Sequence, residues 1–371
     1  MFHWKTLTIL LSILFVTTAC VFPQGDEYEK VYYDFMISTY FRLAVAKTDG
    51  SQFKEALMLP KNSEFDAMKI IYFTNQDQNI VIAKADRAYL LDANNLLLIK
   101  SNDLNFARIY ESSLSPDEQH IVFGARNKNS NWDLYLMDAN DLSVTNITNS
   151  PSTFERFPSF MQDGQNIAFT SIEFGKQQSI IILNLSTSTF DTLLTSPSSD
   201  STPNDYDLQF VSPFLNISDS LLYYCNFYNH SLVSYSLKSK SSNPFYQYVY
   251  PWRPMYFTKD GQFVLFIGYS YPHKLICMDL SNKSVSTITK LEKTDIDYTL
   301  SADGSKIAFT TLTQKNELNG VPSGDYDYYQ LWIINKDGSN KKFIDSGRWP
   351  VFSADGSRLA YDKAYYSVRG E

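Results

Sequence analysis

Three arginines recur at one position of a repeated motif and could bind an anion. Each lies seven residues before an aspartate, and each is followed within two residues by a proline. The arginines are Arg156, Arg253 and Arg348, and the aspartates that follow them are Asp163, Asp260 and Asp355. A guanidinium group presents donors in a fork that matches a carboxylate or a phosphate. The spacing therefore predicts an anion site shared by the three, or, as the alternative, three ion pairs with acidic side chains of neighbouring repeats.

The aspartates belong to a second recurrent feature, a short turn, most often Asp-Gly, between two apolar runs. The clear copies lie at Asp117, Asp163, Asp260, Asp303 and Asp355, and a weaker one surrounds Asp77. Repeated carboxylates could suggest calcium binding or catalysis, but an aspartate in a hairpin turn also accepts hydrogen bonds from backbone amides. Because the same residue recurs at the same turn, we predict that these aspartates are structural and form no metal site.

Motifs of known enzyme classes are scarce in this chain. After the N-terminal segment the histidines are His120, His230 and His273, and their spacing is not that of metal ligands. The sequence also has no Gly-x-Ser-x-Gly nucleophile motif. We therefore predict no catalytic residue, no metal and no cofactor, and we keep an enzyme as the alternative.

Two tyrosine-rich segments could form a binding surface. The longest irregular stretches are expected at Ser196–Asp207, Ser241–Trp252 and Thr313–Tyr329. The second carries Tyr246, Tyr248, Tyr250 and Trp252, and the third carries Asp325, Tyr326, Asp327 and Tyr328. Tyrosine and tryptophan are enriched in recognition surfaces, and loops on rigid scaffolds commonly carry function. The alternative is that these rings only pack against the scaffold beneath them.

The composition limits the fold classes that could position these residues. Of the 371 residues, 15% are aromatic and 19% are charged. These values exclude a wholly disordered chain, and the surplus of Tyr and Phe favours β structure. The net charge of −8 argues against nonspecific binding of nucleic acid, which requires a basic surface.

The N-terminal residues have the layout of a secretion signal. Lys5 precedes an apolar run from Leu7 to Val16, which is shorter than the roughly 20 residues of a membrane-spanning helix. Small residues then lead to Cys20, an arrangement that resembles the lipobox of bacterial lipoproteins, although Thr17 stands where that motif usually has leucine. The resemblance implies a signal peptide over 1–19, lipidation of Cys20 and a tether over 20–30. It also implies an extracytoplasmic protein anchored to a bacterial membrane, with the outer membrane favoured. An ordinary signal peptide is the alternative.

The two other cysteines, Cys225 and Cys277, lie in apolar runs typical of strands. Secreted domains without a large core are usually rich in disulfides, whereas this chain is long enough to bury a core of its own. We predict that both are buried thiols packed as small apolar side chains, with a disulfide as the alternative.

The turn motif divides the chain into repeats. Successive aspartates from Asp77 to Asp355 lie 40, 46, 97, 43 and 52 residues apart. The interval of 97 is twice the usual length of a four-stranded propeller blade, about 40–50 residues, so a degenerate copy is expected near residue 217. Residues 40–47 and 53–59 form two runs without a preceding turn motif, and the last copy, at 350–362, has only two strands. We predict that these two pairs complete one unit. The result is an all-β fold, a seven-bladed β-propeller forming a single domain over 31–371, with six or eight blades as alternatives.

The repeat itself resembles a known family. The run Ser301-Ala302-Asp303-Gly304-Ser305-Lys306-Ile307-Ala308-Phe309 is similar to the repeat of TolB-type, WD40-like propellers. The resemblance covers nearly all of the chain after the signal, most clearly 105–195 and 250–362. It implies a propeller but no particular activity, because such repeats serve scaffolds and enzymes alike. Our hypothesis is a non-enzymatic lipoprotein that binds a protein, peptide or glycan of the cell envelope at its loop-rich face. A glycan lyase or hydrolase acting at the mouth of a central channel is the alternative.

Overall fold

The apolar runs of the sequence form antiparallel β-strands, and the turn motifs between them form hairpins. The computed structural model describes residues 40–51, 53–60, 70–128, 132–173, 177–197, 210–216, 220–227, 229–250, 253–258, 260–291, 297–313 and 328–363. These residues contain strands and turns but no α-helix, and hence no helix long and apolar enough to cross a membrane. Residues Tyr40–Glu371 form one compact unit. The predictions for Cys20, Trp252, Asp325, Tyr326 and Asp327 lie outside the described residues.

Three of the sheets have four antiparallel strands in sequence order. The first contains β3 (Ile70–Thr74), β4 (Asn79–Ala83), β5 (Arg87–Asp92) and β6 (Leu98–Asp103). The second contains β15 (Phe210–Asn216), β16 (Leu221–Asn226), β17 (Ser231–Ser236) and β18 (Ser241–Gln247). The third contains β19 (Tyr256–Phe257), β20 (Phe263–Gly268), β21 (His273–Asp279) and β22 (Val285–Leu291).

A fourth sheet has eight strands because two such units are joined. One unit contains β7 (Phe106–Leu114), β8 (His120–Asn127), β9 (Trp132–Asp138) and β10 (Val144–Asn146). The other contains β11 (Phe154–Phe160), β12 (Asn166–Glu173), β13 (Gln177–Asn184) and β14 (Thr189–Pro197). A parallel bridge between Phe154 and Trp132 connects the units.

The fifth sheet brings the two ends of the described chain together. Its order is β2-β1-β27-β26-β25-β24-β23. Its strands are β23 (Tyr298–Leu300), β24 (Lys306–Thr313), β25 (Tyr328–Asn335), β26 (Lys342–Phe352), β27 (Arg358–Lys363), β1 (Tyr40–Lys47) and β2 (Phe53–Pro60). The first part of β26 pairs with β25 and the last part with β27. Ala44 of β1 pairs with Tyr361 of β27, so the predicted pairing of the N-terminal strands with the end of the chain is confirmed.

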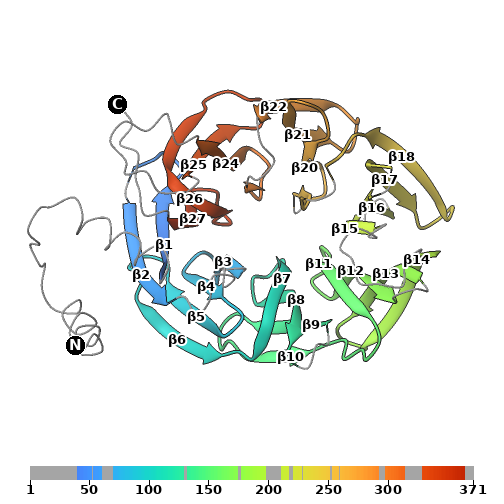
Figure 1. The fold of residues 1–371 in the computed structure, drawn as a ribbon, viewed down its shortest axis with the longest axis horizontal. Coiled ribbons are helices and arrows are strands. Elements are labelled where there is room, and N and C mark those ends of the chain that lie inside the picture. Colours follow the sequence, from blue (N-terminus) through green and yellow to red (C-terminus); the bar gives the residue numbers. More distant parts are fainter. Residues whose placement is uncertain are drawn as a thin grey trace, which may run out of the picture. The chain divides into compact units, whose positions relative to one another are not determined.

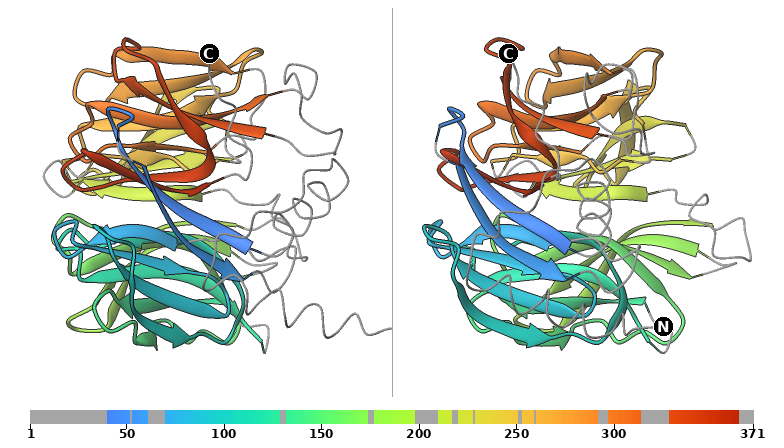
Figure 2. Two further views of the ribbon diagram at one scale, coloured as in Figure 1. Left: turned by 90° about the vertical axis from the view of Figure 1, so that its left-hand side faces the viewer. Right: turned by 60° about the vertical axis from the view of Figure 1, so that its left-hand side comes forward.

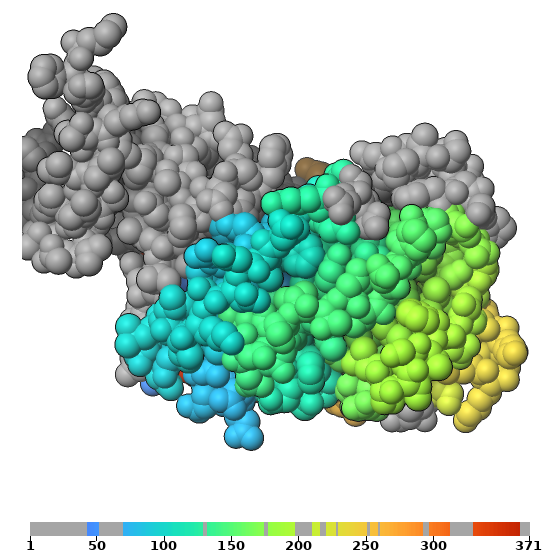
Figure 3. Space-filling view, turned by 90° about the horizontal axis from the view of Figure 1, so that it is seen from below, coloured from blue at the N-terminus to red at the C-terminus, as the bar shows by residue number. Residues whose placement is uncertain are grey.

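Within this unit the sheets surround a common axis in a propeller-like arrangement (Figure 1). Seen from the edge, the blue strands β1 and β2 lie beside the red C-terminal strands (Figure 2). Successive units lie side by side along the rim, which forms a continuous wall in the space-filling view (Figure 3). The strand that opens each unit lies nearest the axis, so residues at the starts of these strands can meet there.

The core lies between neighbouring sheets. Phe123, Phe169, Phe266 and Phe309 occupy equivalent positions on the second strand of four units, and none is more than 1% exposed. Phe309 packs with Leu265 and Ile267 of the preceding sheet, which shows how each aromatic ring fills the space between two units. Cys225 and Cys277 are also buried and free, as the sequence predicted.

The expectation of an irregular stretch over Ser241–Trp252 is wrong in its first part. Ser241–Gln247 is strand β18, which pairs with β17 from Ser236↔Ser241 to Ser231↔Gln247. This outermost strand is largely exposed on both faces, so its polar residues lack the apolar alternation by which a half-buried strand is recognised. Ser196 likewise lies within β14.

Candidate binding sites around the axis and on the adjoining face

Two of the recurrent arginines lie in β-bulges of strands that line the axis. The pairing register shifts between Arg156 and Ser159 in β11, and between Arg348 and Val351 in β26. The residue after each arginine, Phe157 or Trp349, has a positive φ of 55° or 51°. A bulge bends its strand and redirects the side chains around it, and such bulges are common beside functional sites.

Arg156 pairs with Glu111 of the preceding unit. Its Nε donates to Oε2 of Glu111 at 2.8 Å, and its Nη2 contacts Oε1 of the same carboxylate. Tyr110 and Phe157 lie against the guanidinium, with ring centroids 4.8 and 4.7 Å away. Burial raises the pKa of Glu111, but the charge and hydrogen bonds of Arg156 outweigh this effect and hold the pKa below its ordinary value.

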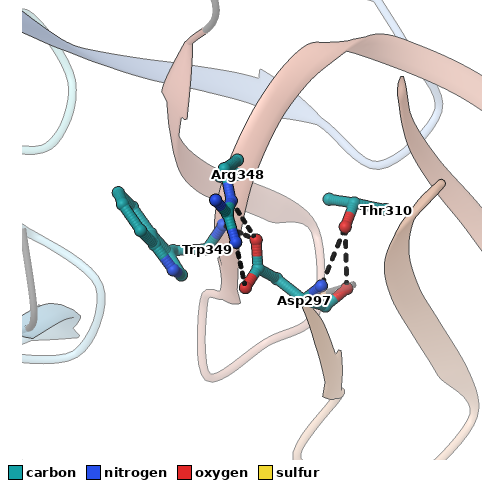
Figure 4. Close-up of polar contacts among 4 residues, drawn as sticks. All are labelled: Asp297, Thr310, Arg348 and Trp349. Atoms are coloured by element: carbon teal, nitrogen blue, oxygen red, sulfur yellow. Dashed lines mark hydrogen bonds and ion pairs between the residues drawn. The ribbon is translucent and has the colours of Figure 1, made fainter. Parts of the chain in front are cut away.

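Arg348 makes the same kind of contact with Asp297 (Figure 4). Its Nε donates to Oδ2 at 2.8 Å and its Nη2 to Oδ1 at 3.4 Å. The backbone of Asp297 is fixed in turn, because its N–H donates to the hydroxyl of Thr310 at 2.8 Å. The guanidinium also lies 4.0 Å from the ring centroid of Tyr329. For Arg156 and Arg348 the structure thus shows the alternative that the sequence left open, an ion pair with an acid of the neighbouring repeat.

The third arginine, Arg253, precedes β19 and lies near a pair of tyrosines. The hydroxyl of Tyr298 donates to the backbone oxygen of Pro254 at 2.6 Å, and the Tyr256 and Tyr298 rings meet edge to face at 5.4 Å. Burial raises the pKa of Tyr256, even though the residue is 37% exposed, and Arg253 lowers it.

Side chains from several sheets influence one another at the axis. Besides burial, Tyr72 of β3, Asp297 and Glu111 all raise the pKa of Tyr256 in β19. The hydroxyl of Tyr72 in turn donates to the backbone oxygen of Ser112 at 3.0 Å. Glu111 and Asp297 were missed by the sequence analysis, although each lies six residues before a turn aspartate, Asp117 or Asp303. The recurrence of an acid at that position was the signal that could have revealed them.

The predicted tyrosine surface is divided between packed and exposed rings. Tyr246 lies in β18 and packs against Phe266 with ring centroids 5.1 Å apart. Tyr248 is 64% exposed, and Tyr250 is half-buried. Tyr328 is the first residue of β25. The structure adds Tyr269 and Tyr271, which are 46% and 89% exposed beside these residues, and which the repeated Tyr in Tyr269-Ser270-Tyr271-Pro272 could have indicated.

The turn aspartates bind the hairpins that contain them. In the turn after β23, Asp303 Oδ1 accepts hydrogen bonds from the Ser301 hydroxyl at 2.6 Å and the Ser305 N–H at 3.0 Å. The same two kinds of bond recur around Asp117, Asp260 and Asp355, and backbone amides also donate to Asp163. These hydrogen bonds stabilise the hairpin turns, which is a structural role. In the described ranges no three His, Cys, Asp or Glu residues are grouped as metal ligands.

Comparisons with known proteins identify the fold. No protein-family model matches the sequence, and no curated protein matches it. TolB from Acinetobacter baumannii is 12% identical with a TM-score of 0.50, over 91% of this chain and 68% of that chain. An oligogalacturonate lyase from Vibrio parahaemolyticus is 11% identical with a TM-score of 0.58, over 88% of this chain and 97% of that chain. A puromycin-hydrolyzing peptidase of Mycobacterium tuberculosis is 11% identical with a TM-score of 0.56, over 79% of this chain and 48% of that chain. The likeness shows a TolB-like β-propeller fold.

Proposed function

We propose that this chain is a seven-bladed, lipid-anchored extracytoplasmic propeller that acts as a non-enzymatic binding module. Its partner is a protein, peptide or glycan that docks on the face carrying Tyr248 and Tyr250. The observation that carries this proposal is the exposure of Tyr248, Tyr269 and Tyr271 on connections between strands. By contrast, Arg156 and Arg348 at the axis hold carboxylates of the protein itself.

The topology supports seven blades. The eight-stranded sheet is two four-stranded units linked by one bridge. The seven-stranded sheet is also two units if the long strand β26 serves as the outermost strand of one and the innermost strand of the next. With the three separate four-stranded sheets, this partition gives seven blades, the last of them completed by β1 and β2.

The proposed location rests on the N-terminal sequence, supported by the fold. Cys20 after a short apolar run is the basis of the lipid anchor, which would make a bacterial membrane the first partner of the protein. The likeness to TolB agrees with a protein of the cell envelope. Nucleic acid is excluded from the proposal, because the net charge of −8 would repel phosphates.

A propeller enzyme is the second candidate. The TM-score of 0.58 to oligogalacturonate lyase and the charged side chains near Tyr256 favour a glycan lyase or hydrolase acting at the axis. Incubation of the purified chain with acidic and neutral polysaccharides, followed by analysis of chain length and unsaturated ends, tests this candidate. If the wild type turns over a polysaccharide, Asp297→Asn loses this activity and the exposed control Asp103→Asn keeps it, the protein is an enzyme and the binding proposal is wrong.

Photo-crosslinking in the native envelope tests the binding proposal. A benzophenone amino acid at position 248 should yield a specific adduct whose other component mass spectrometry identifies. The same group at position 190 is the control, because Phe190 is 52% exposed on outer strand β14. Identical adducts at both positions, or none at position 248, would contradict binding at the proposed face.

A further inference from the structure

Three segments of the chain meet to form a small aromatic surface on the proposed binding face. They are the turn between β16 and β17, the connection after β18 and the connection between β20 and β21. Val249 N–H donates to His230 O at 2.7 Å, and Tyr269 N–H donates to Tyr248 O. These bonds tie the segments together. We call Tyr248, Tyr250, Tyr269 and Tyr271 the tyrosine platform.

Ring contacts fix two of the four platform residues, Tyr250 and Tyr269. Tyr269 stacks on His230 with centroids 4.7 Å apart and an interplanar angle of 25°, and on Tyr250 at 5.7 Å and 26°. His273 meets the edge of Tyr250 at 5.4 Å. Offset stacking and edge-to-face contacts fix the orientations of aromatic rings. Tyr250 and Tyr269 are therefore preorganised, which lowers the entropic cost of binding a ligand against them.

The platform exposes rings at a site where the local backbone is strained. Tyr271 is 89% exposed and Tyr248 is 64% exposed. Tyr248 and His230 have positive backbone φ values of 69° and 53°, a conformation that residues other than glycine rarely adopt. The buried Nδ1 of His230 has no hydrogen-bond partner among the described residues. Strained residues of this kind cluster at ligand-binding sites, because the surrounding structure must maintain them against their cost.

The chemistry of the three segments is aromatic, polar and uncharged. The stretches 227–231, 248–250 and 268–273 contain no Asp, Glu, Lys or Arg. Their exposed large apolar residues are tyrosines, beside the exposed Pro272, whereas Val249 is buried. Phenol and imidazole groups can exchange hydrogen bonds with hydroxyls, while the ring faces can pack against C–H groups.

We propose that the tyrosine platform binds a neutral oligosaccharide, with sugar rings stacked on Tyr271 and Tyr248. This inference rests on the proposed binding function and names the class of its ligand. A pyranose ring presents C–H groups on its faces and hydroxyls at its edge, which matches exposed phenol rings within an uncharged polar surface. A carboxylate-bearing sugar would find no cation within these stretches. A protein interface would be expected to add arginine, methionine or aliphatic side chains to its aromatic core.

Binding of defined oligosaccharides by the purified full-length chain in detergent tests the inference. The probes are neutral oligomers of glucose, mannose and N-acetylglucosamine, with oligogalacturonate as the charged comparison and a proline-rich peptide as the competing class. We expect at least one neutral probe to bind. Tyr271→Ala should weaken that binding about fivefold or more, the effect expected from the loss of one stacked ring.

Two further variants separate ring stacking from folding. Tyr271→Phe keeps the ring and should retain most of the binding, whereas Phe190→Ala removes an exposed ring elsewhere and should leave binding unchanged. The inference is overturned if no neutral probe binds, if only oligogalacturonate or the peptide binds, or if Tyr271→Ala binds as the wild type does. Position-specific crosslinking to a protein partner at residue 248, together with no sugar binding, would retain the proposed function while rejecting this ligand class.

Discussion

Asp297 accepts two hydrogen bonds from the guanidinium of Arg348, a residue 51 positions further along the chain and in the next repeat of the sequence. Glu111 and Arg156 repeat the contact across another pair of units, at a separation of 45 residues. In both pairs the acid lies six residues before a turn aspartate and the arginine seven residues before the next one. The repeat thus places opposite charges of successive units side by side at the axis.

Removal of one partner from the Asp297–Arg348 pair should destabilise the protein. Asp297→Asn leaves the partly buried Arg348 without its counter-charge, and we expect the free energy of unfolding to fall by about 2 kcal/mol. Urea denaturation measures the change. The control is Asp103→Asn, because the Arg87–Asp103 pair is largely exposed and should contribute less than about 1 kcal/mol. Equal losses of unfolding free energy in the two variants would show that the Asp297–Arg348 pair stabilises the protein no more than an exposed ion pair does.

The Glu111–Arg156 pair should make stability depend on pH. The pKa of Glu111 is lower in the folded protein than in the unfolded chain, where it is about 4.3. The ionised Glu111 therefore contributes fully to the free energy of unfolding above the unfolded pKa, and this contribution is lost as the pH falls through the folded pKa. Unfolding free energies of the wild type and Glu111→Gln, measured between about pH 3 and pH 7, should therefore converge at the acidic end.

Glu155 provides the opposite case for the same measurement. Burial raises its pKa, and hydrogen bonds from the Thr153 and Thr148 side chains only partly offset this effect. A carboxyl group whose pKa is raised in the folded protein destabilises the folded state once it ionises. Its contribution to the free energy of unfolding therefore becomes more favourable as the pH falls. The difference between the wild type and Glu155→Gln should thus change with pH in the direction opposite to that for Glu111. Parallel curves for the two variants would refute the assigned shifts.

The sequence predicted the parts of the fold that depend on local patterns. The Asp-Gly turns led to the hairpins, because each turn is encoded within a few adjacent residues. The period of the repeat left an incomplete copy at each end of the chain, which led to the pairing of β1 with β27. Glu111 and Asp297 were missed because the two acids differ in type and make their contacts 45 and 51 residues away. Strand β18 was missed because an outermost strand can be polar on both faces.

The two buried cysteines should be unreactive in the folded protein. Burial raises the pKa of Cys225 to about 12 and that of Cys277 to about 11, so little thiolate is present near neutral pH. Iodoacetamide labelling followed by peptide mass spectrometry should modify neither residue until urea unfolds the chain. Rapid labelling of the native protein at either position would contradict their burial.

Asp77 should stabilise the seam between the first and last parts of the described chain. Its carboxylate accepts the Ala354 N–H at 2.7 Å and the Asp355 N–H at 3.1 Å, 277 and 278 residues away. Asp77→Ala removes the acceptor for both amides, and we expect a loss of about 1–3 kcal/mol. Hydrogen exchange should show faster exchange at residues 354 and 355 before any global change. Unchanged protection of these amides would show that water or another group replaces the carboxylate.

The pairing of β1 with β27 should be required for a stable ring, because it joins the two ends of the described chain through one sheet. Deletion of residues 1–60 removes β1 and β2 and leaves the edge of β27 exposed. It also removes the buried Leu43 and Val45, for which we expect a loss of at least about 3 kcal/mol in the free energy of unfolding.

Deletion of residues 1–39 is the matched control, since it removes the N-terminal segment and retains both strands. A peptide covering residues 40–60 should restore part of the lost stability when added in trans, because it can pair with the free edge of β27. Equal thermal stability of the two deletion variants, or no effect of the peptide, would refute closure of the ring by these strands.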